Sequence, residues 1–255
     1  MADQELPGRW GADSVQLSAV ELLFDGGSKE MVIPASIAFP SGTTVETPLD
    51  RMKRFLKAEY AWYDGFTDSS PNEILPFDLL VAVGLNAFVG GASVGVLRQI
   101  WEGMSADCAP GLSRHSPTRT LAAVSDLQLD SVVDLIYSGC VPRALAAVAT
   151  KVLHRKRSEL IPILDSVVVA ACCRGMTVGV RQVSISKVLQ DRFPESLYRE
   201  ALRVALASVR QDLLSTEPEL HEIASALRDE GWPLTPLRVH DILVWTENEP
   251  RSYYR

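Results

Sequence analysis

From Pro48 onward, the chain is a succession of apolar-periodic segments of helix length, separated by glycine and proline. In "PLDRMKRFLKAEYAWY" the apolar residues recur every three or four positions, and the leading proline suits a first helical turn. Residues that stop helices lie between the segments, namely Gly139, Gly175, Pro194, Pro218, Gly231 and Pro233. The pattern predicts a mainly α fold, a single array of about eight helices with a small extended N-terminal element.

The first 50 residues are the least helical part of the chain. "MVIPASIAF" predicts a short strand or extended segment, and "PSGTTVETP" predicts a polar loop. The expected organisation is an extended, strand-containing segment over 1–50 and a helical domain over 51–255. The stretch 102–119 reads as a loop-rich connection, which divides the helical domain into halves of about 51–110 and 120–255.

The second half carries seven further helix patterns. They are predicted over Leu121–Tyr137, Arg143–His154, Pro162–Arg174, Ser184–Arg192, Glu195–Leu214, Glu217–Glu230 and Leu237–Trp245.

The longest apolar run, Leu79–Leu97, approaches the length that spans a membrane. It contains four glycines and Asn86, and the pair Gly90-Gly91 is expected to divide it into two buried helices. The polar start "MADQELPGRW" does not look like a signal peptide. We therefore expect a cytoplasmic protein without a membrane segment.

The charge of the chain argues against a broad nucleic-acid surface. The net charge is −7, whereas nonspecific binding to phosphate backbones depends on many Lys and Arg contacts. A nucleotide or nucleic-acid partner is therefore disfavoured, although a local basic patch is still allowed. The oligomeric state is not indicated.

The chain has four cysteines, and no two of them have the C-x-x-C spacing: Cys108, Cys140, Cys172 and Cys173. The four histidines form no H-x-x-x-H or H-E-x-x-H pair, and no glycine-rich nucleotide motif is present. Reduced, mostly buried thiols are expected, and neither a metal site nor a cofactor is predicted. His240 is interpreted as a half-buried packing residue.

One basic stretch stands out from this acidic chain, "KVLHRKRSELIPILDSVV" from Lys151 to Val168. On a helix that ends near Arg157, Lys151, His154 and Arg155 share a face, and Lys156 and Arg157 crowd the C-terminus. The residues are either solvated helix-terminal charges or an anion-binding group formed by His154, Arg155, Lys156 and Arg157.

Asp165 is the best single carboxylate candidate in this stretch. If a helix starts at Pro162, Asp165 lies within its first turn among apolar neighbours. Partial burial would raise its pKa or require a cationic partner. Asp165 is therefore either a catalytic carboxylate, with Lys151 as an accompanying amine, or the partner of a nearby cation.

The same stretch resembles a motif of an uncharacterised family of mostly helical bacterial proteins. In that family a Lys-Leu-Leu-x-Arg-Lys-Arg-Pro turn precedes Leu-Ile-Pro-x-x-Asp-x-x-Val, and here Ser158 stands at the proline position. "WYDGFTDSSPNEILPFDLLVAVGLN" and "LRVHDILVWTE" fit the same resemblance, which spans roughly Tyr60 to Glu247. It implies no activity.

A second, more distant resemblance is to the helix-hairpin-helix DNA glycosylases. Pro162 and Asp165 match the Pro-x-x-Asp start of a helix whose Asp stabilises the developing cationic sugar or activates the nucleophile. Lys151 compares with the lysine that some members place on the hairpin's second helix. The hairpin's Gly-x-Gly turn is replaced here by "CVPRALAAVATK", and the usual positive surface is missing.

Tyr63, Asp64 and Asp78 are secondary site candidates, because they place acidic and aromatic groups near one loop; an Asx-type turn would explain them equally. Three functions remain open. The chain is a glycosylase-like enzyme for a nucleoside, nucleotide or nucleic-acid-derived substrate, a non-catalytic helical binding module for a protein or small ligand, or a biosynthetic enzyme that reuses the scaffold.

Overall fold

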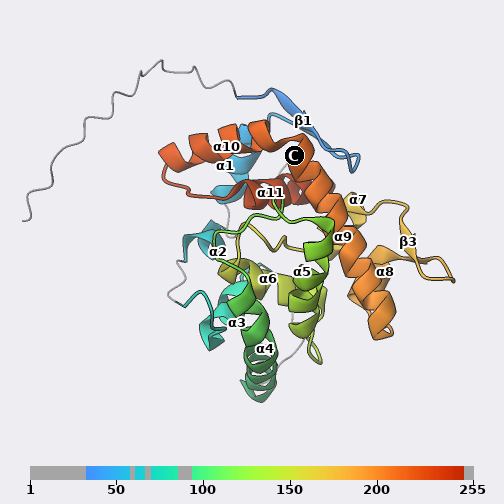
Figure 1. Ribbon diagram of the computed structural model, residues 1–255. Helices are drawn as coiled ribbons and strands as arrows, with labels where there is room; N and C mark the ends of the chain where they lie inside the picture. Colours follow the sequence, from blue (N-terminus) through green and yellow to red (C-terminus); the bar gives the residue numbers. More distant parts are fainter. Residues whose placement is uncertain (1–32, 58–60, 67–69, 86–93, 250–255) are drawn as a thin grey trace, which may run out of the picture. The chain divides into compact units, whose positions relative to one another are not determined.

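The computed structural model describes residues 33–57, 61–66, 70–85 and 94–249, and residues 32–255 fall into one compact unit (Figure 1). Its described part contains two small antiparallel hairpins and eleven helices. In chain order these are β1 (Ser36–Ala38), β2 (Thr44–Glu46), α1 (Pro48–Leu56), α2 (Ala61–Gly65), α3 (Pro76–Val83), α4 (Val94–Arg114), α5 (Asp126–Ser138), α6 (Ala146–Lys156), α7 (Ser166–Cys172), β3 (Thr177–Val178), β4 (Val183–Ser184), α8 (Ile185–Gln190), α9 (Glu195–Ser215), α10 (Glu217–Asp229) and α11 (Pro236–Asn248). The predicted mainly α fold is confirmed.

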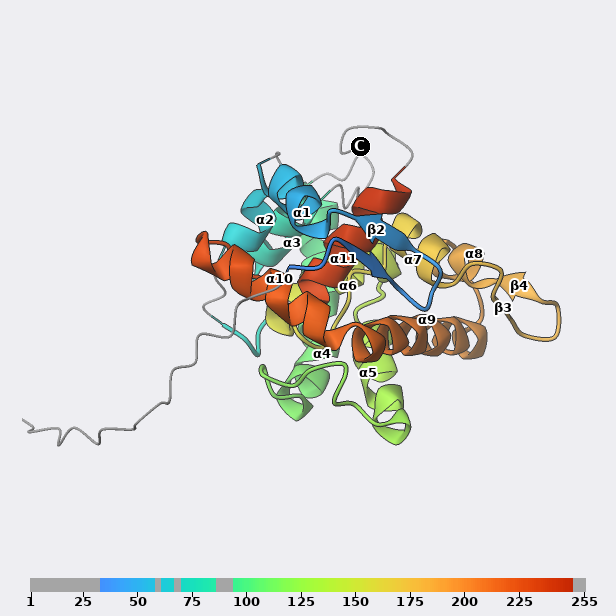
Figure 2. The ribbon, with the colours of Figure 1, turned by 90° about the horizontal axis from the view of Figure 1, so that it is seen from above.

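Helix α11 lies at the centre of the C-terminal helices. It packs against α1, α7, α9, α10 and strand β2, and Figure 2 shows these elements around it. Its central residues are buried, including Val239, Ile242 and Val244. Because α11 is covered on several sides, the polar residues on it that are buried need partners inside the protein.

The N-terminal hairpin corrects one expectation. The strand predicted near Ala35 is present as β1, but the following segment is not simply a loop, because Thr44–Glu46 forms β2 and pairs with β1 in antiparallel register. Val45 is fully buried against the core. Alternation of exposed and buried residues in both strands explains the pairing, and only three residues in each strand carry the pattern.

The stretch 102–119 is also different from the expected loop. Helix α4 runs through it as far as Arg114, because Ile100, Met104, Cys108 and Leu112 recur every four residues and are buried on one face. Gly111 allows close packing on α5, since a Cβ there would lie 2.8 Å from Leu135 Cδ1. Gly111 therefore serves helix packing, and exposed Pro110 lies within the continuous helix.

The helix after Pro162 begins later than predicted. Ile163 N donates to Asp241 Oδ2 at 2.8 Å, and Leu164 N donates to Thr150 Oγ1 at 3.0 Å. These contacts with α11 and α6 hold the segment out of a helix, and α7 starts only at Ser166. Asp165 is consequently the residue before the helix and not a member of its first turn.

The apolar run from Leu79 is helical in α3 as far as Val83, and Val94 begins α4; the expected break at Gly90-Gly91 lies outside the described residues. Within the part that the structure describes, every helix is too short or too polar to cross a membrane.

Candidate active site

A cavity of about 710 Å³ lies between α6, the segment 163–169, α8 and α11. This volume falls in the range of about 300–1,000 Å³ that is typical of small-molecule sites. Most of its wall is apolar, with aromatic contributions from Phe55 and Trp245. Its ionisable lining residues are Arg143, Lys151, Asp165, Arg238, Asp241 and Glu249.

Lys151 is placed in this cavity by the middle of α6. The residue is 4% exposed, and its Nζ donates to the carbonyl oxygen of Leu85 at 2.5 Å. Burial lowers the pKa of Lys151, against the opposing effect of the Asp165 carboxylate. A buried ammonium with one carbonyl acceptor among the described residues retains further N–H groups for a ligand.

Asp165 is the N-cap residue of α7, and it lines the same cavity. Its Oδ1 accepts hydrogen bonds from the backbone amides of Val167 and Val168, both at 3.0 Å. Within the described part of the chain, Oδ2 has no hydrogen-bond partner. Burial raises the pKa of Asp165, whereas Lys151 and the two amides lower it. The cap fixes one oxygen and leaves the other for chemistry.

The structure places Lys151 and Asp165, the two catalytic candidates from the sequence, on the wall of one cavity. They interact electrostatically across the cavity wall, but no hydrogen bond or ion pair joins them within the described residues. The pKa of the amine is lowered and that of the carboxyl is raised. Lys151 is thus a stronger acid, and Asp165 a stronger base, than in water.

Arg238 and Asp64 support the wall next to this pair. Asp64 accepts two hydrogen bonds from Arg238, from Nε at 2.7 Å and from Nη2 at 2.9 Å. Both side chains are only 6% exposed, and the guanidinium lies 5.2 Å from the centre of the Tyr63 ring. Such a two-point ion pair holds the guanidinium in one orientation.

Tyr63 is tied directly to the lysine's backbone. Its hydroxyl donates to the carbonyl oxygen of Lys151 at 2.6 Å, and burial raises the pKa of this phenol. The secondary candidates Tyr63 and Asp64 therefore lie next to Lys151: Tyr63 contacts its backbone, and Asp64 holds the neighbouring Arg238.

The basic turn lies in a different direction. Arg155 Nε donates to Asp78 Oδ1 at 3.0 Å, and Lys156 Nζ lies 2.7 Å from Asp78 Oδ2. Asp78 also accepts from the amide of Leu75 at 2.8 Å. All three ionic side chains are buried, which joins α3 to α6.

Arg157 and His154 are buried as well. Arg157 is completely buried, and its guanidinium donates to the carbonyl oxygens of Leu112, His115 and Pro71 and to the side chain of Asn72. His154 Nδ1 lies 2.6 Å from the carbonyl oxygen of Ile161. None of the residues from His154 to Arg157 is among those that line the cavity. Their contacts within the described chain bind loops and helices together, and anion binding by them stays a prediction.

Arg143 is an arginine that the sequence did not single out. It lines the cavity, is exposed, and has a positive φ of 74° in the loop before α6. Such a conformation is uncommon outside glycine and is often found at functional sites. Within the described residues its guanidinium makes no hydrogen bond or ion pair, which leaves it available to an anion.

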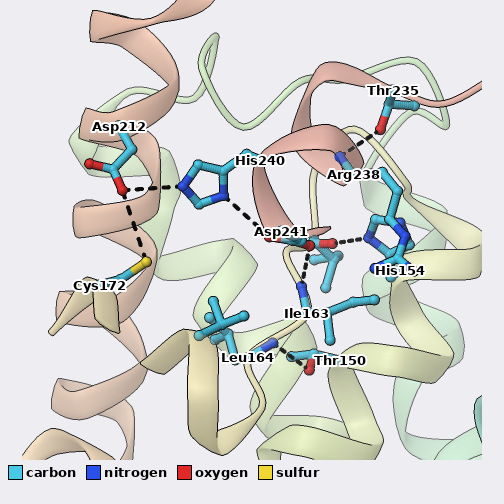
Figure 3. A network of polar contacts seen from close by, with 12 residues as sticks. Thr150, His154, Ile163, Leu164, Cys172, Asp212, Thr235, Arg238, His240 and Asp241 are labelled. Carbon is cyan, nitrogen blue, oxygen red and sulfur yellow. Dashed lines mark hydrogen bonds and ion pairs between the residues drawn. The ribbon is translucent and has the colours of Figure 1, made fainter. Parts of the chain in front are cut away.

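Figure 3 shows a second polar cluster, which adjoins the cavity through the lining residue Asp241. His240 Nε2 is 3.1 Å from Asp212 Oδ2, and His240 Nδ1 is 3.4 Å from Asp241 Oδ1. Cys172 Sγ lies 3.9 Å from the same Asp212 oxygen. Burial opposes the charged imidazole, but the two carboxylates raise the pKa of His240 well above its ordinary value.

Sequence reasoning missed this cluster. Cys172 and Asp212 are 40 residues apart, and Asp212 and His240 are 28 apart, so that no short motif joins them. The interpretation of His240 as half buried was wrong, because the residue is fully buried. The one available signal was the occurrence of charged residues inside strongly apolar helix patterns.

The chain belongs to the DUF6308 family, a family of unknown function, which it matches over residues 49–248. No curated protein and no solved structure gives a significant match.

Proposed function

We propose that the chain is a glycosylase-like enzyme that cleaves the N-glycosidic bond of a nucleoside, nucleotide or nucleic-acid-derived substrate. The observation that carries the proposal is the pair Lys151 and Asp165 on one cavity, with its opposite pKa shifts and a carboxylate oxygen left without a partner among the described residues. The likeness of Pro162-x-x-Asp165 to the helix-hairpin-helix DNA glycosylases supports the same reading.

In the proposed reaction, water adds to the anomeric carbon while the bond from that carbon to the base nitrogen breaks. Asp165 Oδ2 stabilises the developing positive charge of the sugar and takes the proton of the attacking water. The base leaves with the bonding electron pair and takes a proton from the Lys151 ammonium. A lysine with a lowered pKa and a carboxylate with a raised pKa suit these two roles.

The remaining lining residues suit a small substrate. Phe55 and Trp245 contribute aromatic rings to the cavity lining, which suits a base, and exposed Arg143 offers donors to a phosphate. The net charge of −7 and the absence of hairpin glycines disfavour a long polyanion. A nucleoside or nucleotide is therefore the favoured substrate class.

The test is release of free base, measured chromatographically from a panel of nucleosides, nucleotides and short DNA and RNA. Asp165→Asn should reduce the rate about 10²–10⁴-fold, because an amide neither takes the proton nor stabilises the cation, while its oxygen still caps α7. Lys151→Ala should also lose activity. Asp191→Asn and Lys187→Ala, which change exposed residues outside the cavity, are the matched controls.

A second candidate function is a non-catalytic module that binds a small ligand in the same cavity. The buried network of Asp78 with Arg155 and Lys156 favours it, because that network uses the basic turn for structure. A thermal shift with a nucleotide but no base release by the wild-type chain would support this function and contradict the enzymatic one.

A further inference from the structure

Three metal-ligating side chains from three different helices meet in the interior. Cys172 of α7, Asp212 of α9 and His240 of α11 each offer one ligand atom, and these atoms lie within 4.8 Å of one another (Figure 3). All three residues are at most 1% exposed. None of them lines the cavity, so the cluster is separate from the Lys151–Asp165 pair.

We propose that Cys172, Asp212 and His240 form a structural zinc site. A thiolate, an imidazole and a carboxylate are the ligand types that zinc takes in proteins. With bond lengths of about 2.0–2.3 Å, ligand atoms of a tetrahedral zinc ion lie about 3.2–3.8 Å apart. Asp212 Oδ2 lies 3.1 Å from His240 Nε2 and 3.9 Å from Cys172 Sγ, each within a few tenths of an ångström of that range, and all three ligand atoms lie within 4.8 Å of one another.

The surrounding hydrogen bonds match those of a metal-bound histidine. With Nε2 on the ion, the Nδ1–H of His240 points to Asp241 Oδ1 at 3.4 Å, and Asp241 Oδ2 accepts from Ile163 N at 2.8 Å. A carboxylate behind a ligating histidine fixes its tautomer and ring orientation. Asp241 thereby contacts His240 with Oδ1 and the backbone amide of Ile163, before α7, with Oδ2.

The carboxylate ligand is oriented in the same way. Asp212 Oδ1 accepts a hydrogen bond from the amide of Ser41 at 2.8 Å, which leaves Oδ2 for the ion. The Ser41 hydroxyl is buried and has no hydrogen-bond partner in the described structure. A buried hydroxyl without a partner is a polar group that a water could satisfy.

Binding replaces two protons by one ion. The Cys172 thiol loses its proton to become a thiolate, and the imidazole must be neutral with its proton on Nδ1. The site is closed to solvent and joins α7, α9 and α11, so an ion held there would act by stabilising the fold. The three side chains leave one position of a tetrahedral ion to a further ligand such as a water.

The first measurement uses the full-length chain. After removal of metal with a chelator, one equivalent of Zn²⁺ should be retained through desalting, as measured by elemental analysis. The same addition should raise Tm by several degrees, because the ion binds the folded state.

Cobalt(II) identifies the ligands. The Co²⁺-loaded chain should show a thiolate-to-metal absorption band, which Cys172→Ser should abolish. Cys173→Ser is the matched control, because Cys173 is the adjacent buried cysteine and should leave the band unchanged.

Two results would overturn the site. A metal-free wild-type chain that takes up no Zn²⁺ or Co²⁺, or a cobalt band that survives Cys172→Ser, would leave only a hydrogen-bonded cluster around His240. Neither result depends on base release, so this test and that of the proposed enzyme succeed or fail separately.

Discussion

At the scale of single residues, the basic turn shows how a charge run can be buried. Arg157 is completely buried because its planar guanidinium meets carbonyl oxygens from several segments. His154 is also buried, and its Nδ1 contacts the carbonyl oxygen of Ile161. The sequence left open whether these two residues are solvated or bind an anion; both are buried, and their contacts in the described residues include backbone carbonyl oxygens.

We expect His154 to make the fold sensitive to acid. Burial lowers the pKa of His154 below the value of about 6.5 that it has in an unfolded chain. As the pH falls below about 6.5, the unfolded state binds a proton at His154 more readily than the folded state does. The contribution of His154 to stability is therefore complete above this pH and is lost as the pH falls. His154→Gln, which keeps an N–H donor but does not titrate, should lose less stability between pH 7 and pH 5 in urea titrations.

The exposed His221→Gln provides the comparison for this experiment and should retain the wild-type acid sensitivity. Buried His115, whose pKa burial also lowers, keeps part of the pH dependence in either variant. Equal pH profiles for His154→Gln and the wild type would contradict the assignment.

At the scale of elements, the join between α3 and α6 rests on one carboxylate. Asp78 is 2% exposed, and it meets Arg155, Lys156 and the amide of Leu75. Removing one partner of a buried ion pair leaves the other charges buried without compensation. The free energy lost in this way is larger than the loss or gain from replacing the whole pair with apolar residues.

Asp78→Ala should therefore lower the free energy of unfolding by about 3–5 kcal/mol, measured by urea denaturation. Asp126→Ala is the matched control: Asp126 is also an acidic residue of a first helical turn that pairs with an arginine, Arg210, but it is exposed. Its removal should cost at most about 1 kcal/mol. Similar losses in the two variants would show that the Asp78 pairs contribute as little as surface pairs.

At the scale of the whole molecule, one continuous core takes side chains from both predicted halves of the helical domain. Met104 of α4 and Leu206 of α9 belong to the same buried cluster, and neither has measurable exposure. Helix α4 continues through the segment that was expected to separate the halves. The described part of residues 32–255 should accordingly unfold as one unit.

Met104→Ala and Leu206→Ala should each lower the stability of the same single transition by about 2–5 kcal/mol, followed by circular dichroism and by fluorescence. Leu127→Ala, at an apolar side chain that is 91% exposed, should leave the transition almost unchanged. Two separate transitions, each shifted by only one of the core variants, would instead support two independent halves.

The sequence by itself determined the mainly α fold and most of its helices, and it singled out Lys151 and Asp165, because apolar periodicity and capping residues act over a few neighbouring positions. It missed the part of α4 within 102–119. It also placed the segment before Asp165 in a helix, where tertiary hydrogen bonds from Ile163 and Leu164 prevented one. Only the tertiary structure decided that the basic turn is buried and that Cys172, Asp212 and His240 meet. Those outcomes depend on contacts between residues far apart in the chain, which no local pattern records.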